Sequence, residues 1–128
     1  MEEKNNPLSP HLQIYRWQIS SLLSITHRIV GVINIIAITI ICFWSLSLLL
    51  GAENYLIINN FFQSFFGKFV AVGLCWTFSF HILNELRHLF WDLGYGFDLK
   101  ISKITGVLAL VGSFILTVLF YLIGKNIF

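Results

Sequence analysis

Ionisable side chains gather in one otherwise apolar stretch, SFHILNELRHLFWDLGYG, at residues 79–96. Five polar residues there are spaced 3, 1, 3 and 4 apart, which places them on one stripe of an α-helix. They are His81, Asn84, Glu85, His88 and Asp92. Imidazole and carboxylate groups bind metals and transfer protons. Ionisable residues in an apolar helix normally face a protein interior or a cavity, so the stripe is a candidate site.

His81 is the residue in this stripe that could bind a metal most simply. His88 follows it by seven residues, about 10 Å along a helix. The two therefore cannot bind one iron from opposite sides. Haem iron commonly takes imidazole as an axial ligand, and His81 could supply one. We expect His27 and His88 nearer the membrane surface than His81, and His11 outside the membrane. A second ligand would then come from another subunit. The alternative is a His81 that hydrogen-bonds a neighbouring helix.

A second polar group precedes the first long apolar run and shares one helical face: Ser24, His27, Arg28 and Gly31. The Arg28 guanidinium could bind a haem propionate or a quinone carbonyl, or it could extend to lipid phosphate. Ser24 offers a hydroxyl donor, or is only a small packing residue. Gly31 would let another helix or a flat ligand approach the backbone.

The elements that must position these groups are membrane-spanning helices. The chain is 57% hydrophobic and 11% charged, with a mean hydropathy of +0.82, whereas soluble domains carry about 25% charged residues. Residues 29–50 and 104–124 are uncharged, and each is close to the roughly 20 residues that span a bilayer core. Residues 61–84 form a third apolar run that contains Lys68. We predict an all-α membrane protein with three transmembrane helices.

The 128 residues predict a single domain, 1–128,. The expected helices are about 21–50, 66–92 and 103–124. Residues 1–20 are expected to lie on the inner membrane surface, and the loop YLIINNFFQSFF to be an interfacial amphipathic piece. Small residues on the last helix permit close helix contact: Gly106, Gly112, Ser113 and Thr117. So small a bundle with so many polar groups predicts partner subunits.

The distribution of positive charge predicts the orientation. Six cations lie before the first span or near the second loop, namely Lys4, Arg16, Arg28, Arg87, Lys100 and Lys103. Two, Lys68 and Lys125, lie on the other side. The positive-inside rule then places the N-terminus in the cytoplasm or matrix. Both polar groups fall toward the inner side, so they can meet. The polar start of the chain does not fit a signal peptide, so we expect the first span to direct its own insertion.

Two motifs carry a family resemblance. Residues 9–32 resemble the N-terminal signature of the cytochrome b large membrane-anchor subunits of succinate dehydrogenase, respiratory complex II. That signature reads S-P-H-x-x-I-Y, then S-x-x-H-R-x-x-G; the matches are Ser9, Pro10, His11, Ile14, Tyr15, Ser24, His27, Arg28 and Gly31. Residues 81–96 resemble the second signature, H-x-x-x-G-x-R-H-x-x-W-D, through His81, Arg87, His88, Trp91 and Asp92. Glu85 stands where this signature has glycine.

The resemblance implies roles for the matching residues. His81 would be the metal ligand of haem b, with the second ligand from a small anchor subunit. His27, Arg28 and His88 would also bind the haem, the first two at its propionates. The quinone site would contain Ser24, Arg28 and Asp92, the last near a proton path.

The resemblance further implies a subunit of succinate:ubiquinone oxidoreductase, without a dehydrogenase active site of its own. Its partners would be a small anchor subunit, an iron–sulfur subunit, a flavoprotein subunit, ubiquinone and membrane lipids, and no nucleic acid. Its place would be the mitochondrial inner membrane or the bacterial cytoplasmic membrane. The alternatives are a fumarate reductase anchor that works in reverse and a haem-free scaffold that docks soluble subunits. A transporter subunit would need a polar path through the apolar outer halves of the helices.

Overall fold

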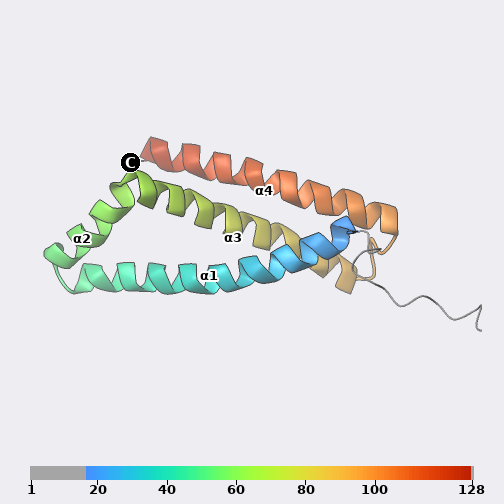
Figure 1. Ribbon diagram of the computed structural model, residues 1–128, viewed down its shortest axis with the longest axis horizontal. Coiled ribbons are helices and arrows are strands. Elements are labelled where there is room, and N and C mark those ends of the chain that lie inside the picture. Colours follow the sequence, from blue (N-terminus) through green and yellow to red (C-terminus); the bar gives the residue numbers. More distant parts are fainter. Residues whose placement is uncertain (1–16, 128) are drawn as a thin grey trace, which may run out of the picture.

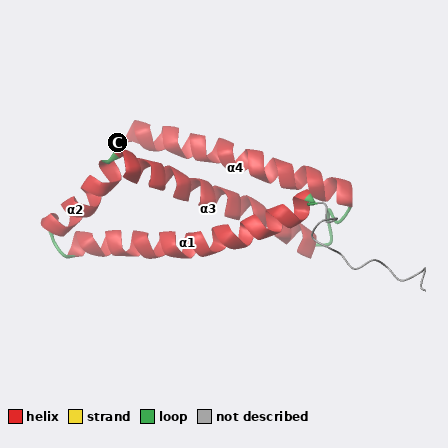
Figure 2. Cartoon of the chain, in the orientation of Figure 1, coloured by secondary structure: helices red, strands yellow, loops and turns green. Residues whose placement is uncertain are grey.

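The computed structural model describes residues 17–127, which fold into four helices and no strand. Their bounds are α1 Ile19–Leu49, α2 Ala52–Gln63, α3 Phe65–Asp92 and α4 Leu99–Ile127 (Figures 1 and 2). Three of them, α1, α3 and α4, are long and apolar enough to cross a membrane. The predicted all-α membrane fold with three transmembrane helices is therefore confirmed.

The three long helices run side by side along the long axis of the molecule (Figure 1). α3 packs against both α1 and α4. α2 joins α1 to α3 at one end, and the loop at 93–98 joins α3 to α4 at the other. The segment expected to be an interfacial amphipathic piece is this short helix α2, in which no residue is fully buried.

The helix ends follow local chemistry. Ser64 caps α3, since its hydroxyl accepts a hydrogen bond of 3.1 Å from the backbone N–H of Gly67,. Gly94 and Gly96 have φ angles of +86° and +83°, which favour glycine, and they turn the chain from α3 into α4. α1 begins two residues before the expected residue 21, and α4 begins four before the expected 103. Of the predicted surface segment 1–20, residues 1–16 lie outside the described part.

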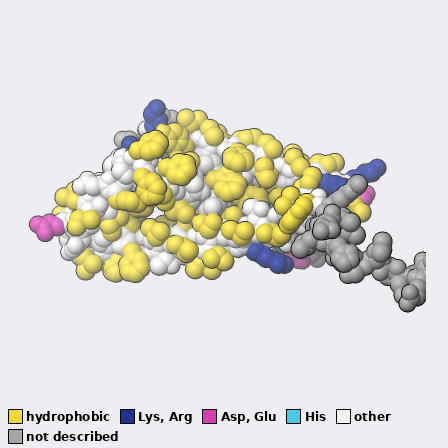
Figure 3. Space-filling view, in the orientation of Figure 1, with side chains coloured by type: hydrophobic (Ala, Val, Ile, Leu, Met, Phe, Trp, Pro, Cys, Tyr) yellow, Lys and Arg dark blue, Asp and Glu magenta, His cyan; other side chains and the backbone are white. Residues whose placement is uncertain are grey.

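The interior is small and largely polar. Leu23, Val30 and Phe80 form the buried apolar cluster, while a larger set of buried residues is polar: Asn34, Ser47, Thr77, Ser79, Asn84, Arg87, Ser113 and Thr117. On the face drawn in Figure 3, apolar side chains are spread over the middle and charged ones lie mostly toward the ends. This distribution suits a bilayer, where helices associate through close packing and polar contacts rather than through hydrophobic burial.

Small residues of α4 let it approach its neighbours closely, as the sequence predicted. Ser113 is fully buried and Thr117 is nearly so. A Cβ added at Gly106 would overlap Leu23 Cδ1, and one at Gly112 would lie 3.1 Å from Leu83 Cδ1. α4 can therefore lie this close to α1 and α3 because glycine has no side chain at these two positions.

Candidate functional site

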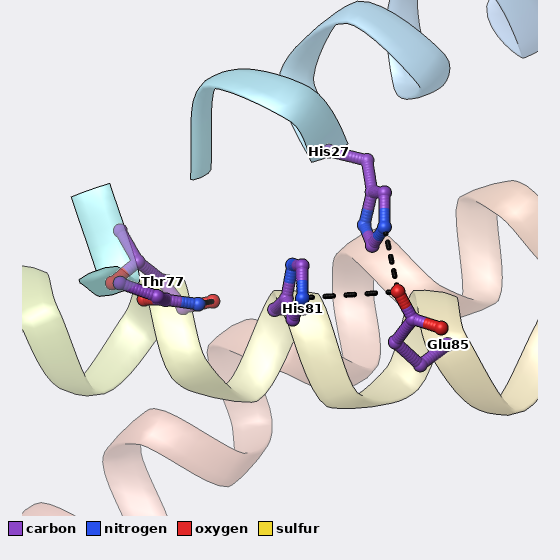
Figure 4. A network of polar contacts seen from close by, with 5 residues as sticks. His27, Thr77, His81 and Glu85 are labelled. Carbon is purple, nitrogen blue, oxygen red and sulfur yellow. Dashed lines mark hydrogen bonds and ion pairs between the residues drawn. The ribbon is translucent and has the colours of Figure 1, made fainter. Parts of the chain in front are cut away.

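Two histidines and one carboxylate meet between α1 and α3. His27 Nε2 lies 2.9 Å from Glu85 Oε1, and His81 Nε2 lies 3.7 Å from the same oxygen (Figure 4). Glu85 is one helical turn after His81 on α3, so both project toward α1. The potential ligand atoms of the three residues all lie within 4.8 Å of one another. This arrangement concentrates metal-binding and proton-binding groups at one point of the bundle.

The rings of His27 and His81 are stacked, with centroids 4.3 Å apart and planes at 5°. That His27 lies nearer the membrane surface than His81 stays a prediction. The two rings are nevertheless in contact, with His27 on the Glu85 side of His81 (Figure 4). The cause is the register of α1 against α3, which cannot be predicted from the positions of residues along either helix alone. Gly31 permits the close approach: a Cβ there would lie 3.4 Å from His81 Cε1.

His88 extends this cluster toward the end of α3. Its ring lies 5.3 Å from that of His27 and, on the other side, 5.3 Å from the ring of Trp91. The structure thus brings together three of the four residues predicted to bind haem: His27, His81 and His88. Each belongs to the interface of α1 with α3 or to its edge.

Several buried polar atoms lack a hydrogen-bond partner within residues 17–127. They are His27 Nδ1, Asn34 Oδ1, Trp76 Nε1, His81 Nδ1 and Asn84 Oδ1. An unsatisfied buried polar atom costs about 1–3 kcal/mol. All five atoms belong to α1 or α3.

His81 fits an axial haem ligand. Its side chain is 31% exposed, and Nε2 makes no hydrogen bond, because the Glu85 oxygen is 3.7 Å away,. His27 stacks on the face of the ring, whereas the lone pair of an imidazole nitrogen points outward in the plane of the ring. The stacked ring therefore does not cover the direction in which Nε2 would bind iron, and Glu85 is the described group beside that atom.

Ser24, Arg28 and Asp92, the predicted quinone residues, are all exposed. None of them makes a hydrogen bond or ion pair through its side chain within the described chain. Although Ser24 and Arg28 share a helical face with His27 in sequence, only His27 turns toward α3. A binding site built from these three residues needs a second surface to enclose it.

Arg87 takes a role that the sequence did not reveal. Its side chain is buried between α3 and α4. Its guanidinium donates to Ser102 and Thr105 at 2.8–3.2 Å and lies 4.2 Å from the centre of the Trp91 ring. Among residues 17–127, Arg87 forms no ion pair. The spacing of four buried residues could have predicted this burial, because it places them on one face of a helix. They are Thr77, Phe80, Asn84 and Arg87.

Asn34 is a second feature that the sequence did not reveal, whereas the buried Asn84 belongs to the predicted stripe. Asn34 is 5% exposed and its amide lies 3.5 Å from the backbone oxygen of Thr77, while Asn84 is 1% exposed. Asn34 follows Gly31 by three residues and is the lone amide in the apolar run at 29–50. A polar residue placed so within a span marks an interhelical contact.

Comparison with known proteins shows which family this chain matches. Residues 2–120 match the profile of the succinate dehydrogenase/fumarate reductase transmembrane subunit. The chain is 44% identical over 115 residues to the succinate dehydrogenase cytochrome b556 subunit of Rickettsia felis, covering 90% of each chain. It is 33% identical to the subunit of that name from Paracoccus denitrificans, over 90% of this chain and 88% of that one. The cytochrome b560 subunit of Reclinomonas americana is 35% identical over 93% and 86% of the two chains.

Proposed function

The chain belongs to the succinate dehydrogenase/fumarate reductase transmembrane subunit family, and we propose that it binds haem b and builds a ubiquinone-reduction site. As a membrane subunit of this family, it works with other subunits of the complex. We assign its partners as a small anchor subunit, an iron–sulfur subunit and a flavoprotein subunit. The dehydrogenase active site would belong to the soluble subunits.

The observation that carries the haem proposal is the state of His81. Within residues 17–127 its Nε2 lacks a hydrogen bond and its buried Nδ1 has no partner, and Gly31 leaves room for its ring. The cytochrome b names of the relatives agree with a haem in this family. His81 would be one ligand of the haem iron, and the small anchor subunit would supply the second. His27, Arg28 and His88 would hold the rest of the group. The bound haem would supply a one-electron carrier within the membrane.

The quinone site is proposed at Ser24, Arg28 and Asp92. Reduction of a quinone takes two electrons and two protons, and negative charge builds on its carbonyl oxygens as the electrons arrive. The Arg28 guanidinium and the Ser24 hydroxyl can donate hydrogen bonds to those oxygens and stabilise that charge. Asp92, exposed at the end of α3, can transfer protons from water. Because the three side chains have no partners in the described chain, they are free to bind a ligand.

The same assignment sets the orientation. We propose that the end of the bundle with the loop at 93–98 lies on the cytoplasmic or matrix side, since the cations near it outnumber those at the other end,. Electrons from an iron–sulfur subunit on that side would then reach the quinone residues over the shortest path. The membrane would be an inner mitochondrial or bacterial cytoplasmic membrane, and the N-terminus would lie inside. A fumarate reductase anchor, the reverse reaction, is the second candidate, because the family profile includes both activities.

A reduced-minus-oxidised spectrum of the purified complex tests the proposal. We expect a b-type signal in the wild type and its loss in His81→Ala, with His88→Ala as the comparison. A signal that survives in His81→Ala but not in His88→Ala would move the ligand to His88. Absence of a b-type signal from the wild type would overturn the haem assignment and favour a haem-free anchor.

A further inference from the structure

Arg87 is a buried cation that pairs with no carboxylate in the described part of the chain. Its side chain belongs to a residue only 8% exposed, and its hydrogen bonds go to the uncharged Ser102 and Thr105 through Nε and Nη2. Nη1 makes no hydrogen bond, and no carboxylate pairs with the guanidinium, within residues 17–127. Charged groups inside a membrane normally pair with an opposite charge or line a site. We therefore expect an anion from another molecule to bind this guanidinium.

The same side chain lines a groove of about 510 Å³ between α3 and α4. The rest of the wall is mainly hydrocarbon, supplied by Leu83, Leu86, Phe90, Ile101 and Leu108. Trp91, which stacks under Arg87, and Tyr95 of the α3–α4 loop stand at the end near that loop. Tryptophan and tyrosine are typical of the headgroup level of a bilayer. The groove therefore runs from a cationic, aromatic end at the interface into an apolar stretch at membrane depth.

We propose that this groove binds an anionic phospholipid, with its phosphate at Arg87 and an acyl chain along the apolar wall. A guanidinium is well suited to phosphate, because its donors match the phosphate oxygens. Basic pockets between transmembrane helices on the inner side of a membrane are typical sites for anionic headgroups. A peptide carboxylate would satisfy the charge but would leave the apolar wall without an occupant, so the combination favours a lipid.

This site is separate from the proposed haem and quinone residues. Its wall contains none of His27, His81 or Glu85, which meet between α1 and α3. The inference is thus independent of whether haem binds. A lipid here would add to the contact of α3 with α4 that the hydrogen bonds of Arg87 to Ser102 and Thr105 make at this end.

Native mass spectrometry of the detergent-solubilised complex tests the proposal, with dioleoylphosphatidylglycerol and dioleoylphosphatidylcholine added as probes to delipidated protein. We expect the wild type to bind phosphatidylglycerol in preference to phosphatidylcholine. Arg87→Gln keeps a hydrogen-bond donor and removes the charge; it should weaken phosphatidylglycerol binding about tenfold, as loss of one charge-assisted hydrogen bond does. Lys103→Gln removes an exposed cation from the same end of α4 and should change nothing.

Leu108→Trp provides a second variant that leaves Arg87 intact and fills the groove, because Leu108 is 62% exposed and lines it. It should also release the lipid, whereas Val107→Trp, outside the groove on the same helix, should retain it. Equal binding of the two lipids by the wild type would overturn the proposal. So would undiminished phosphatidylglycerol binding by Arg87→Gln, or by Leu108→Trp if the arginine variant fails to assemble.

Discussion

Glu85 joins the two helices that carry the histidines: its Oε1 lies 2.9 Å from Nε2 of His27 on the opposite helix. The carboxylate stands at the position where the second signature has glycine, and it lies within hydrogen-bond distance of a histidine of its own chain. It also lies 3.7 Å from Nε2 of His81. Glu85, the residue that departs from the second signature, thus lies beside both histidines of the cluster.

The first prediction concerns the charge of Glu85. Because His27 Nδ1 is buried without an acceptor, a neutral imidazole that donates Nε2–H to the carboxylate suits the site, and the negative charge stays uncompensated. A negative charge beside a haem disfavours the added electron, so Glu85→Gln and Glu85→Gly should raise the haem midpoint potential. Redox titration of the purified complex measures it. Glu53→Gln, an exposed carboxylate on α2, is the control.

Haem content distinguishes this effect from damage to the site. Pyridine haemochrome assays should show the same haem per complex in Glu85→Gln as in the wild type. An unchanged potential at equal haem content would show that the carboxylate does not act on the haem.

The second prediction concerns Gly31. This glycine faces His81, and a Cβ at its position would lie 3.4 Å from His81 Cε1. A leucine there would need the space that the imidazole occupies, so Gly31→Leu should displace the ring and lower the haem content of the complex. Gly73→Leu is the matched control on α3, because no atom lies within 4 Å of a Cβ built there. Full haem content in Gly31→Leu would contradict the close approach of α1 to α3 at this point.

The third prediction concerns the quinone residues. Ser24→Ala and Arg28→Leu should lower ubiquinone reduction, the arginine variant by at least about tenfold, since each removes a donor to developing negative charge. Succinate oxidation by soluble artificial acceptors should stay intact, because it does not require the membrane site. Lys125→Leu, at the other end of the bundle, is the control. Equal loss of both activities would indicate failed assembly instead of a quinone role.

The fourth prediction concerns the contact of α4 with its neighbours. A side chain at Gly106 would overlap Leu23 and lie against Arg87. Gly106→Val should therefore lower the free energy of unfolding by about 1–3 kcal/mol, as overpacking does. Gly124→Val is the control, because a Cβ at Gly124 would have open space around it. It shows what a β-branched side chain does to the helix when nothing is overpacked. Thermal unfolding in detergent, followed by circular dichroism, would compare the two variants; equal midpoints would contradict the tight packing.

The sequence by itself determined the class of fold and the residues at issue. Apolar runs of spanning length indicate transmembrane helices because a bilayer leaves a backbone few other ways to satisfy its hydrogen bonds. The helical period was enough to gather His81, Glu85 and His88 on one face, because that period is a property of the single helix.

What only the tertiary structure decided is how one helix lies against another. The register of α1 on α3 stacks the ring of His27 on that of His81 and brings Glu85 close to both. The packing of α4 buries Arg87 against Ser102 and Thr105. Spacing along a helix cannot supply these facts, because depth and burial depend on the tilt and offset between helices. Those follow from small residues such as Gly31 and Gly106 meeting particular side chains across the interface.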